Sequence, residues 1–172
     1  MKNLTKYFAF LLVVVVFSAS SFAQQSSTAT ASTTATIVTP ILITKATDMN
    51  FGNVASGASV GTVVLTPASA RSTTGGVSAT TAMGGTISAA AFTVTGQGSY
   101  TYAISLPVAA ITLAGTTAGV TVGTFVSTPS GTGTLTAGTQ TLQVGATLNL
   151  PVSVAAGSYT NAAGLSVTVN YN

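Results

Sequence analysis

The sequence has no cysteine, histidine or tryptophan, and its one acidic side chain is Asp48. Without thiolates or imidazoles, the chain lacks the ligands from which most zinc sites are built. A single carboxylate excludes the paired acids of glycoside hydrolysis, and a serine nucleophile would have no imidazole to accept its proton. The sequence therefore predicts a protein that is not an enzyme and that holds no metal and no cofactor.

Charge is scarce along the whole chain. Charged residues make up 3% of it, against about 25% in ordinary soluble domains. After residue 23 the charges are Lys45, Arg71 and Asp48, so two positive charges minus one negative charge leave +1. Two cations cannot neutralise the many phosphates that a nucleic-acid site engages, which excludes nucleic acid as a partner. A threonine-rich, nearly uncharged surface has little self-repulsion and favours packing against other protein copies.

The first 23 residues have the features of a secretory signal peptide. Lys2 and Lys6 form a basic segment that precedes an apolar run over residues 7–17. Residues 21–23 supply a small-residue cleavage site. The run is about 11 residues long, whereas a membrane span needs about 20, so a retained anchor is the weaker alternative. We expect residues 1–23 to be removed and the protein to reach the periplasm, the cell surface or the extracellular space, without membrane insertion.

The remaining chain is predicted to comprise a leader and one domain. Residues 24–35 contain glutamine, serine, threonine and alanine but no large apolar side chain, which indicates a flexible leader. The alternative is an arm that reaches a neighbouring subunit. Residues 36–172 carry short β-branched runs separated by glycine and proline, which indicates one β-domain.

Alternation of apolar and polar residues marks the strands of this domain. Residues 164–172 alternate without a fault, and their predicted inward face is Leu165, Val167, Val169 and Tyr171. Residues 141–150 alternate in the same way and predict an interior strand. Residues 92–95 and 100–106, joined by a glycine turn, predict a β-hairpin. Pro40 cannot donate to a β-ladder, so it places the segment around it at a sheet edge.

Seven to nine short strands, each with one apolar face, predict two packed antiparallel sheets. A closed barrel is the alternative, but the uneven strand lengths and Pro40 favour a sandwich. No amphipathic helical pattern extends beyond two turns outside residues 1–23. The sequence therefore predicts an all-β sandwich.

An ordered set of motifs resembles the bacterial exported family called domain of unknown function 4402, over about residues 34–172. The motifs lie at residues 49–52, 92–96, 102–107, 144–148, 156–160 and 167–171. The resemblance implies an immunoglobulin-like or pilin-like β-sandwich at the cell surface, with no established activity. The chain is also similar to spore-coat and fimbrial subunits, which commonly end in an alternating strand with tyrosine next to last. Their usual disulfide is missing here.

Two functions of different classes fit these features. The first is a structural subunit of a surface fibre or layer that joins itself or related subunits by strand pairing, as edge strands can do. The candidate donor or edge residues are Ile37, Val38, Ile41, Leu42 and Ile43. The second is a binding module or adhesin that recognises a glycan or a protein through the predicted loops 67–85 and 127–140. In the first of these loops Arg71 either contacts a partner or caps a cluster of carbonyl groups.

Overall fold

The structure, a computed structural model, describes residues 26–172. The chain divides into two compact units, Met1–Thr36 and Ile37–Asn172, each described by itself. The predicted signal peptide, residues 1–23, lies outside the described residues. Residues 26–36 have no regular secondary structure and are exposed. Within residues 26–172, no helix is both long enough and apolar enough to cross a membrane.

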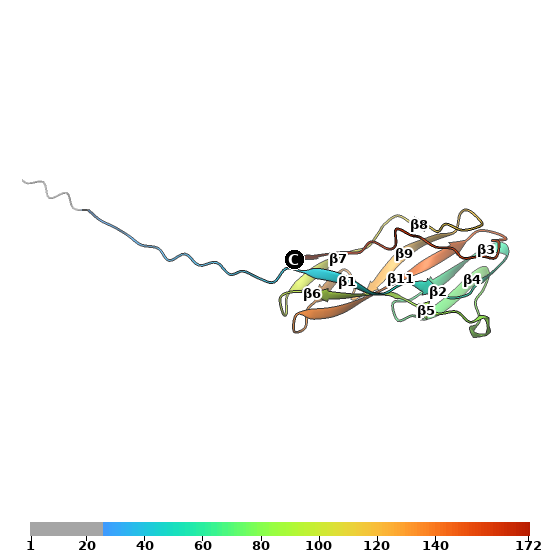
Figure 1. The fold of residues 1–172 in the computed structure, drawn as a ribbon, viewed down its shortest axis with the longest axis horizontal. Helices are drawn as coiled ribbons and strands as arrows, with labels where there is room; N and C mark the ends of the chain where they lie inside the picture. Colours follow the sequence, from blue (N-terminus) through green and yellow to red (C-terminus); the bar gives the residue numbers. More distant parts are fainter. Residues whose placement is uncertain (1–25) are drawn as a thin grey trace, which may run out of the picture. The chain divides into compact units, whose positions relative to one another are not determined.

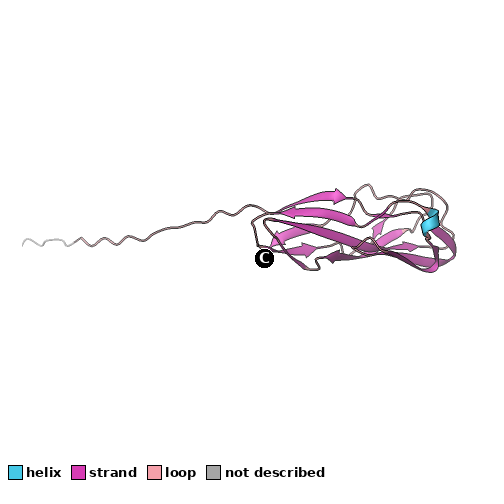
Figure 2. Ribbon diagram, turned by 90° about the horizontal axis from the view of Figure 1, so that it is seen from below, coloured by secondary structure: helices cyan, strands magenta, loops and turns pink. Residues whose placement is uncertain are grey.

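The second unit is built almost entirely of strands, and its one helical element is a single 3-10 turn, η1 (Thr81–Met83) (Figure 2). The strands are β1 (Leu42–Thr47), β2 (Asn50–Phe51), β3 (Ala55–Leu65), β4 (Arg71–Ser78), β5 (Ile87–Ser88), β6 (Ala90–Thr95), β7 (Thr101–Ser105), β8 (Ile111–Thr112), β9 (Thr121–Thr128), β10 (Thr132–Thr134), β11 (Thr139–Leu150) and β12 (Thr168–Tyr171). There are more strands than the seven to nine predicted, partly because β2, β5 and β8 have two residues each.

All strand pairs are antiparallel, which confirms the predicted all-β antiparallel sandwich. The large sheet has seven strands in the order β1-β6-β11-β3-β4, with β9 on β11 and β8 on β9. A small sheet has the order β10-β7-β12, and β2 pairs with β5 alone. In Figure 1, β1, β6 and β7 lie toward one end of the domain, and β2, β3, β4 and β5 toward the other.

Strand β11 is the centre of the large sheet. One of its edges pairs first with β6, up to Val144, and then with β3, from Ala146 onward. Its other edge pairs with β9. Its side chains alternate as predicted, and Leu142, Val144, Ala146, Leu148 and Leu150 are all buried. The interior strand expected over residues 141–150 is therefore confirmed.

The core is divided into two clusters along β11. The first lies between the large and small sheets, and its buried members are Ala90, Phe92, Val94, Tyr102, Leu135, Leu142, Val144 and Val169. The second lies beyond the small sheet, and its buried members are Val63, Val77, Val120, Val122, Ala146, Leu148 and Leu150. The small sheet therefore packs on the first cluster and not on the second.

The predicted hairpin of residues 92–95 and 100–106 is wrong. Strand β6 pairs with β1 and β11 in the large sheet, whereas β7 pairs with β10 and β12 in the small sheet. Val94 and Tyr102 both have no exposed surface and face the first cluster from opposite sheets. The glycine turn therefore carries the chain across the sandwich and does not join two neighbouring strands.

The loops 67–85 and 127–140 are also more regular than the sequence indicated. Strand β4 occupies Arg71–Ser78 within the first, and β10 occupies Thr132–Thr134 within the second. Both strands consist mainly of glycine, serine and threonine, whose small side chains leave no clear alternation of apolar and polar residues. A binding surface made of free loops would therefore be smaller than expected.

The C-terminal segment completes the small sheet. Strand β12 pairs with β7, Val169 is buried, and Leu165, Val167 and Tyr171 are half-buried against the first cluster. The Tyr171 hydroxyl donates to the Thr39 carbonyl oxygen at 2.8 Å and accepts from the Gln97 backbone N–H at 2.6 Å. The last strand thereby holds the residues that precede β1.

The first cluster makes stability depend on pH through Tyr102. Burial raises the pKa of the Tyr102 phenol above its ordinary value of 10.0, and the hydroxyl donates to Gln140 Oε1 at 2.8 Å. Above about pH 10 the unfolded chain loses a proton that the folded chain keeps, so stability falls as pH rises. We expect Tyr102→Phe to lose less unfolding free energy between pH 8 and pH 11 than the unsubstituted chain does, as measured by urea unfolding. Equal losses would contradict this role.

Candidate functional site

The small sheet covers only one half of the large sheet, and a groove lies over the other half. The groove has a volume of about 1250 Å³. It is lined by residues of the segments 45–56 and 154–165 and by residues of the large sheet. No long strand faces the second cluster here. Its partners are side chains of irregular segments, among them Met49, Val54, Leu113, Val154 and Tyr159. The second sheet of the sandwich is therefore incomplete at this end.

The floor of the groove is apolar and comes from the large sheet. Alternate residues of β11 point inward, as a period-two strand requires, and an irregularity of β9 at Thr124 brings both Val122 and Phe125 to the groove. They are joined by side chains of β6 and β8 and of the segment that follows β8. The apolar floor residues are Ala90, Phe92, Ile111, Leu113, Val120, Val122, Phe125, Leu148 and Leu150. Such a floor stabilises apolar side chains that are laid on it, at about 25 cal/mol for each Å² of apolar surface removed from water.

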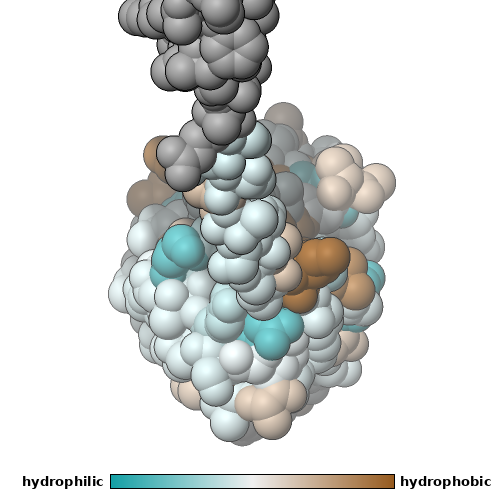
Figure 3. Space-filling view, turned by 90° about the vertical axis from the view of Figure 1, so that its left-hand side faces the viewer, coloured by the Kyte–Doolittle hydropathy of each residue, from teal (hydrophilic) through white to brown (hydrophobic). Residues whose placement is uncertain are grey.

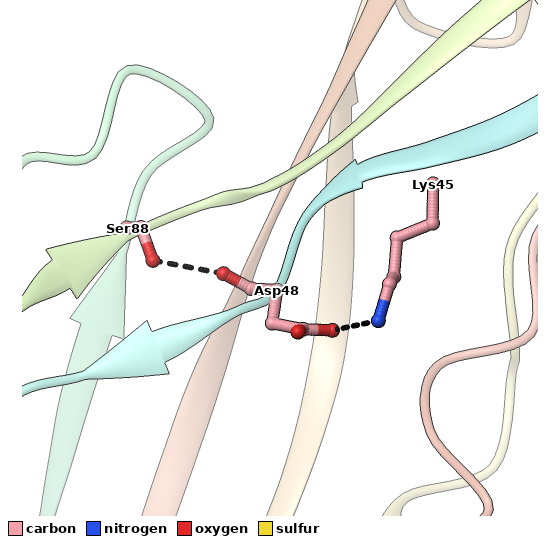
Figure 4. A network of polar contacts seen from close by, with 3 residues as sticks. All are labelled: Lys45, Asp48 and Ser88. Atoms are coloured by element: carbon pink, nitrogen blue, oxygen red, sulfur yellow. Dashed lines mark hydrogen bonds and ion pairs between the residues drawn. The ribbon is translucent and has the colours of Figure 1, made fainter.

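One wall of the groove is the segment 45–56, which contains β2. Strand β2 pairs with β5 on one edge, and no strand pairs with its other edge among residues 26–172. The Ser88 hydroxyl donates to the Asp48 carbonyl oxygen at 2.8 Å (Figure 4). Lys45 Nζ lies 2.7 Å from Asp48 Oδ1, but both side chains are mostly exposed, so this ion pair adds little stability.

Arg71 holds this wall from the side of β4. Its guanidinium donates to the carbonyl oxygens of Phe51 at 2.6 Å, Asn53 at 3.1 Å and Ala79 at 3.1 Å. Those carbonyls belong to the segment that precedes β3 and to the one that follows β4, and a planar guanidinium can satisfy several of them at once. Of the two roles left open by the sequence, the contacts are those of carbonyl capping. Contact between Arg71 and a partner stays a prediction.

Replacing Arg71 by lysine should therefore be costly although it keeps the charge. A single ammonium cannot reach carbonyls on both segments, so we expect Arg71→Lys to lower the free energy of unfolding by about 1–3 kcal/mol. Lys45→Ala, which removes the exposed ion pair, should cost less than about 1 kcal/mol. Urea unfolding of both variants measures the difference. Equal costs would show that the guanidinium geometry does not matter.

The opposite wall is the segment 154–165, which runs back along the domain toward the C-terminus (Figure 1). Its only β-bridge in the described chain joins Thr160 to Ala114. Side chains hold the rest: the Tyr159 hydroxyl donates to the Ala155 carbonyl oxygen at 2.8 Å, and Ser56 Oγ accepts from the Val154 N–H at 3.2 Å. Much of this wall's backbone is thus free of ladder partners.

The arrangement suits the binding of a chain segment better than chemistry. The ionisable side chains that line the groove are Lys45, Asp48 and Tyr159, and the first two are paired with each other. The edge of β2 that no described strand pairs, the irregular wall 154–165 and the apolar floor favour an added β-strand, since such a strand needs main-chain partners and a place for alternate side chains.

The candidate donor residues lie at the edge of the large sheet. Leu42 and Ile43 belong to β1 and pair with Thr95 and Val94 of β6 in the same copy. Ile41 and Ile43 pack against the first cluster, which engages them within their own domain. Ile37 is 97% exposed and Val38 is half-buried, and both precede the first strand. Ile37 and Val38 are therefore the candidates that neither belong to β1 nor pack against the first cluster.

Sequence reasoning did not identify the groove residues. The wall 154–165 has no strand signal, and the wall 45–56 has only the short motif around Phe51. One signal is present in the sequence: residues 151–165 are long enough for a strand, but their apolar and polar residues do not alternate. A segment of that kind after a long central strand indicates an irregular cover.

Comparisons with known proteins identify the family alone. A search of curated proteins and a search of solved structures returned no significant match. A family model described as "Domain of unknown function (DUF4402)" matches residues 41–171, which include both walls and the floor of the groove. The match spans all twelve strands, from the start of β1 at Leu42 to the end of β12 at Tyr171. This chain belongs to the DUF4402 family.

Proposed function

We propose that this protein is a non-enzymatic, exported structural protein of the cell surface, whose copies associate by strand pairing. The observation that carries the proposal is the groove, an incomplete part of the second sheet with an apolar floor. Open strand edges are templates for pairing with another chain, and native proteins normally cover them. A structural subunit has a use for such an edge, because each added strand supplies main-chain hydrogen bonds together with apolar contacts.

The surface chemistry supports association of like copies. Viewed from one end, the surface is mostly pale, with a few strongly hydrophilic areas and separate apolar areas (Figure 3). Three ionisable side chains with formal charge occur after residue 23, and two of them form the ion pair Lys45–Asp48. Copies of this chain therefore approach one another with little electrostatic repulsion.

Export is the second part of the proposal and rests on the first residues of the sequence. The lysines at positions 2 and 6, the apolar run 7–17 and the small residues 21–23 fit a cleavable signal. Export would place the domain in the periplasm, at the cell surface or outside the cell. N-terminal sequencing of the exported protein should give Gln24 as its first residue.

Electron microscopy of the purified exported protein, together with denaturing gels of unboiled samples, tests the proposal. We expect fibres or sheets in the images and a ladder of species on the gel that boiling collapses to one band. Strand-paired assemblies resist detergent because their main-chain hydrogen bonds lie over a buried apolar floor. Single particles in the images and one monomer band without boiling would refute the structural role.

A further inference from the structure

Residues 28–37 alternate with a period of two although they lie before the first strand. One set is Ala29, Ala31, Thr33, Ala35 and Ile37, apolar apart from Thr33, and the other consists of the hydroxyl residues Thr28, Thr30, Ser32, Thr34 and Thr36. Threonine and isoleucine favour strands, and alternation gives a strand one face for a core and one for water. We call residues 28–37 the alternating tract.

The structure leaves the alternating tract without a strand partner. The first strand of the described residues begins at Leu42, and residues 28–37 are exposed. A segment that can form a strand but has no partner in its own copy is free to pair elsewhere. The sequence reading of residues 24–35 as a flexible leader therefore omits a pattern that these residues contain.

The tract is long enough to form a strand and carries mostly small side chains. An extended chain rises about 3.3 Å per residue, so residues 28–37 would span about 33 Å. The small side chains of Ala29, Ala31 and Ala35 suit a floor already occupied by half-buried aromatic residues such as Phe125. The hydroxyl residues would then face water, as the outer face of a sandwich requires.

We propose that the alternating tract of one copy lies in the groove of a second copy and adds a strand beside β2, where the second layer of the sandwich is incomplete. This inference rests on the proposed function and names the segment and the site that carry the association. The tract would lie between the wall around β2 and the wall 154–165, with Ala31 and Thr33 toward the floor. The tract has no charged side chain, and the charged side chains of the two walls are Lys45 and Asp48, which pair with each other. The contact therefore buries no unpaired charge.

A second copy fits better than the tract's own groove because of how β1 is anchored. The Thr39 N–H donates to Gln97 Oε1 at 3.2 Å, and its carbonyl oxygen accepts from the Tyr171 hydroxyl. From Thr39, about 20 Å of extended chain leads to Lys45, where the lining of the groove begins. The tract precedes Thr39, so to enter its own groove the chain would have to reverse within residues 37–38, directly before the bonded backbone groups of Thr39.

The geometry of this contact determines the kind of assembly. The donor segment and the acceptor groove are different surfaces, so the contact is heterologous and each bound copy still offers a free tract or a free groove. Such contacts either close into rings or continue as open filaments. The inference therefore predicts chains of copies and not an isolated two-fold dimer.

Two neighbouring substitutions in the full exported chain test the inference. Ala31→Asp puts a carboxylate on the face turned to the apolar floor, whereas Ser32→Asp puts the same charge on the face turned to water. Burying an unpaired carboxylate is strongly unfavourable, so we expect Ala31→Asp to raise the concentration needed for assembly about 100-fold or more. Ser32→Asp should change it less than about threefold. Pelleting by ultracentrifugation measures the assembled fraction.

Hydrogen exchange then locates the contact. In assemblies of the unsubstituted chain, amides of residues 49–54 and 155–165 should exchange more slowly than in Ala31→Asp at the same concentration. Assembly that is equally sensitive or insensitive to both substitutions, or that leaves these amides unprotected, would overturn the inference but not the structural role. An unsubstituted chain that stays monomeric would refute the structural role itself. A monomer with protected groove amides would show that the tract occupies its own groove.

Discussion

Gly145→Ala is expected to lower the free energy of unfolding by about 3 kcal/mol or more, although it adds a single methyl group. Gly145 lies where the edge of β11 passes from β6 to β3. A Cβ atom at this position would overlap the carbonyl oxygen of Leu65 and the backbone of Thr66 and Pro67. Backbone atoms cannot rotate away as a side chain does, so β3 would have to move from β11.

The matched control is Gly98→Ala in the connection between β6 and β7. A Cβ atom there would have its nearest neighbour, the Gly138 nitrogen, at 3.6 Å, which is ordinary van der Waals contact. We expect a change within about 0.5 kcal/mol for this variant. Urea unfolding at low protein concentration compares the two. A loss of unfolding free energy below about 1 kcal/mol for Gly145→Ala would contradict the close backbone packing of β3 against β11 at this position.

Leu142→Ala should cost about 2–5 kcal/mol of unfolding free energy. The Leu142 side chain has no exposed surface and lies in the first cluster, between the two sheets. Truncation removes apolar contacts and leaves a cavity that a rigid pair of sheets fills only in part. A whole domain is stable by about 5–15 kcal/mol, so this one change removes a large share.

Thr141→Ala is the control for this substitution, because Thr141 is the neighbouring residue of β11 and its side chain is exposed. Its expected effect is within about 0.5 kcal/mol. Guanidinium unfolding of both variants gives the comparison, provided that the m-values agree with that of the unsubstituted chain. Similar costs at positions 141 and 142 would contradict the inward orientation assigned to Leu142.

The strands with one apolar face could be predicted from the sequence. Along β11, alternation identifies which side chains are buried, because successive residues of a strand point to opposite sides. The missing N–H of Pro40 likewise indicated an edge position, and β1 has one partner strand, β6. These features depend on a few neighbouring residues, so a single sequence contains them.

The choice of sheet for each strand could not be predicted in this way. Strands β6 and β7 alternate as a hairpin would, but their side chains meet across the core and their backbones pair with other strands. The Arg71 contacts with Phe51 and Ala79 likewise join segments that are distant or irregular in sequence. Such choices depend on packing between distant residues, which periodicity does not report.

The groove was hidden for a related reason. Its floor alternates like any buried face, and nothing in Val122 or Leu148 shows that their cover is irregular. The alternating tract was hidden because alanine and threonine differ little in size, so their alternation is weak in apolar character. In our proposal, the free edge of β2 and the irregular wall 154–165 give that tract a place to bind.

The mass of the exported protein in solution, measured by light scattering over a range of concentrations, tests the central claim most directly. If the tract of one copy binds in the groove of the next, the mass should rise with concentration through whole-number multiples of the mass of one processed chain. A mass that remains that of a single chain up to millimolar concentration would contradict the account.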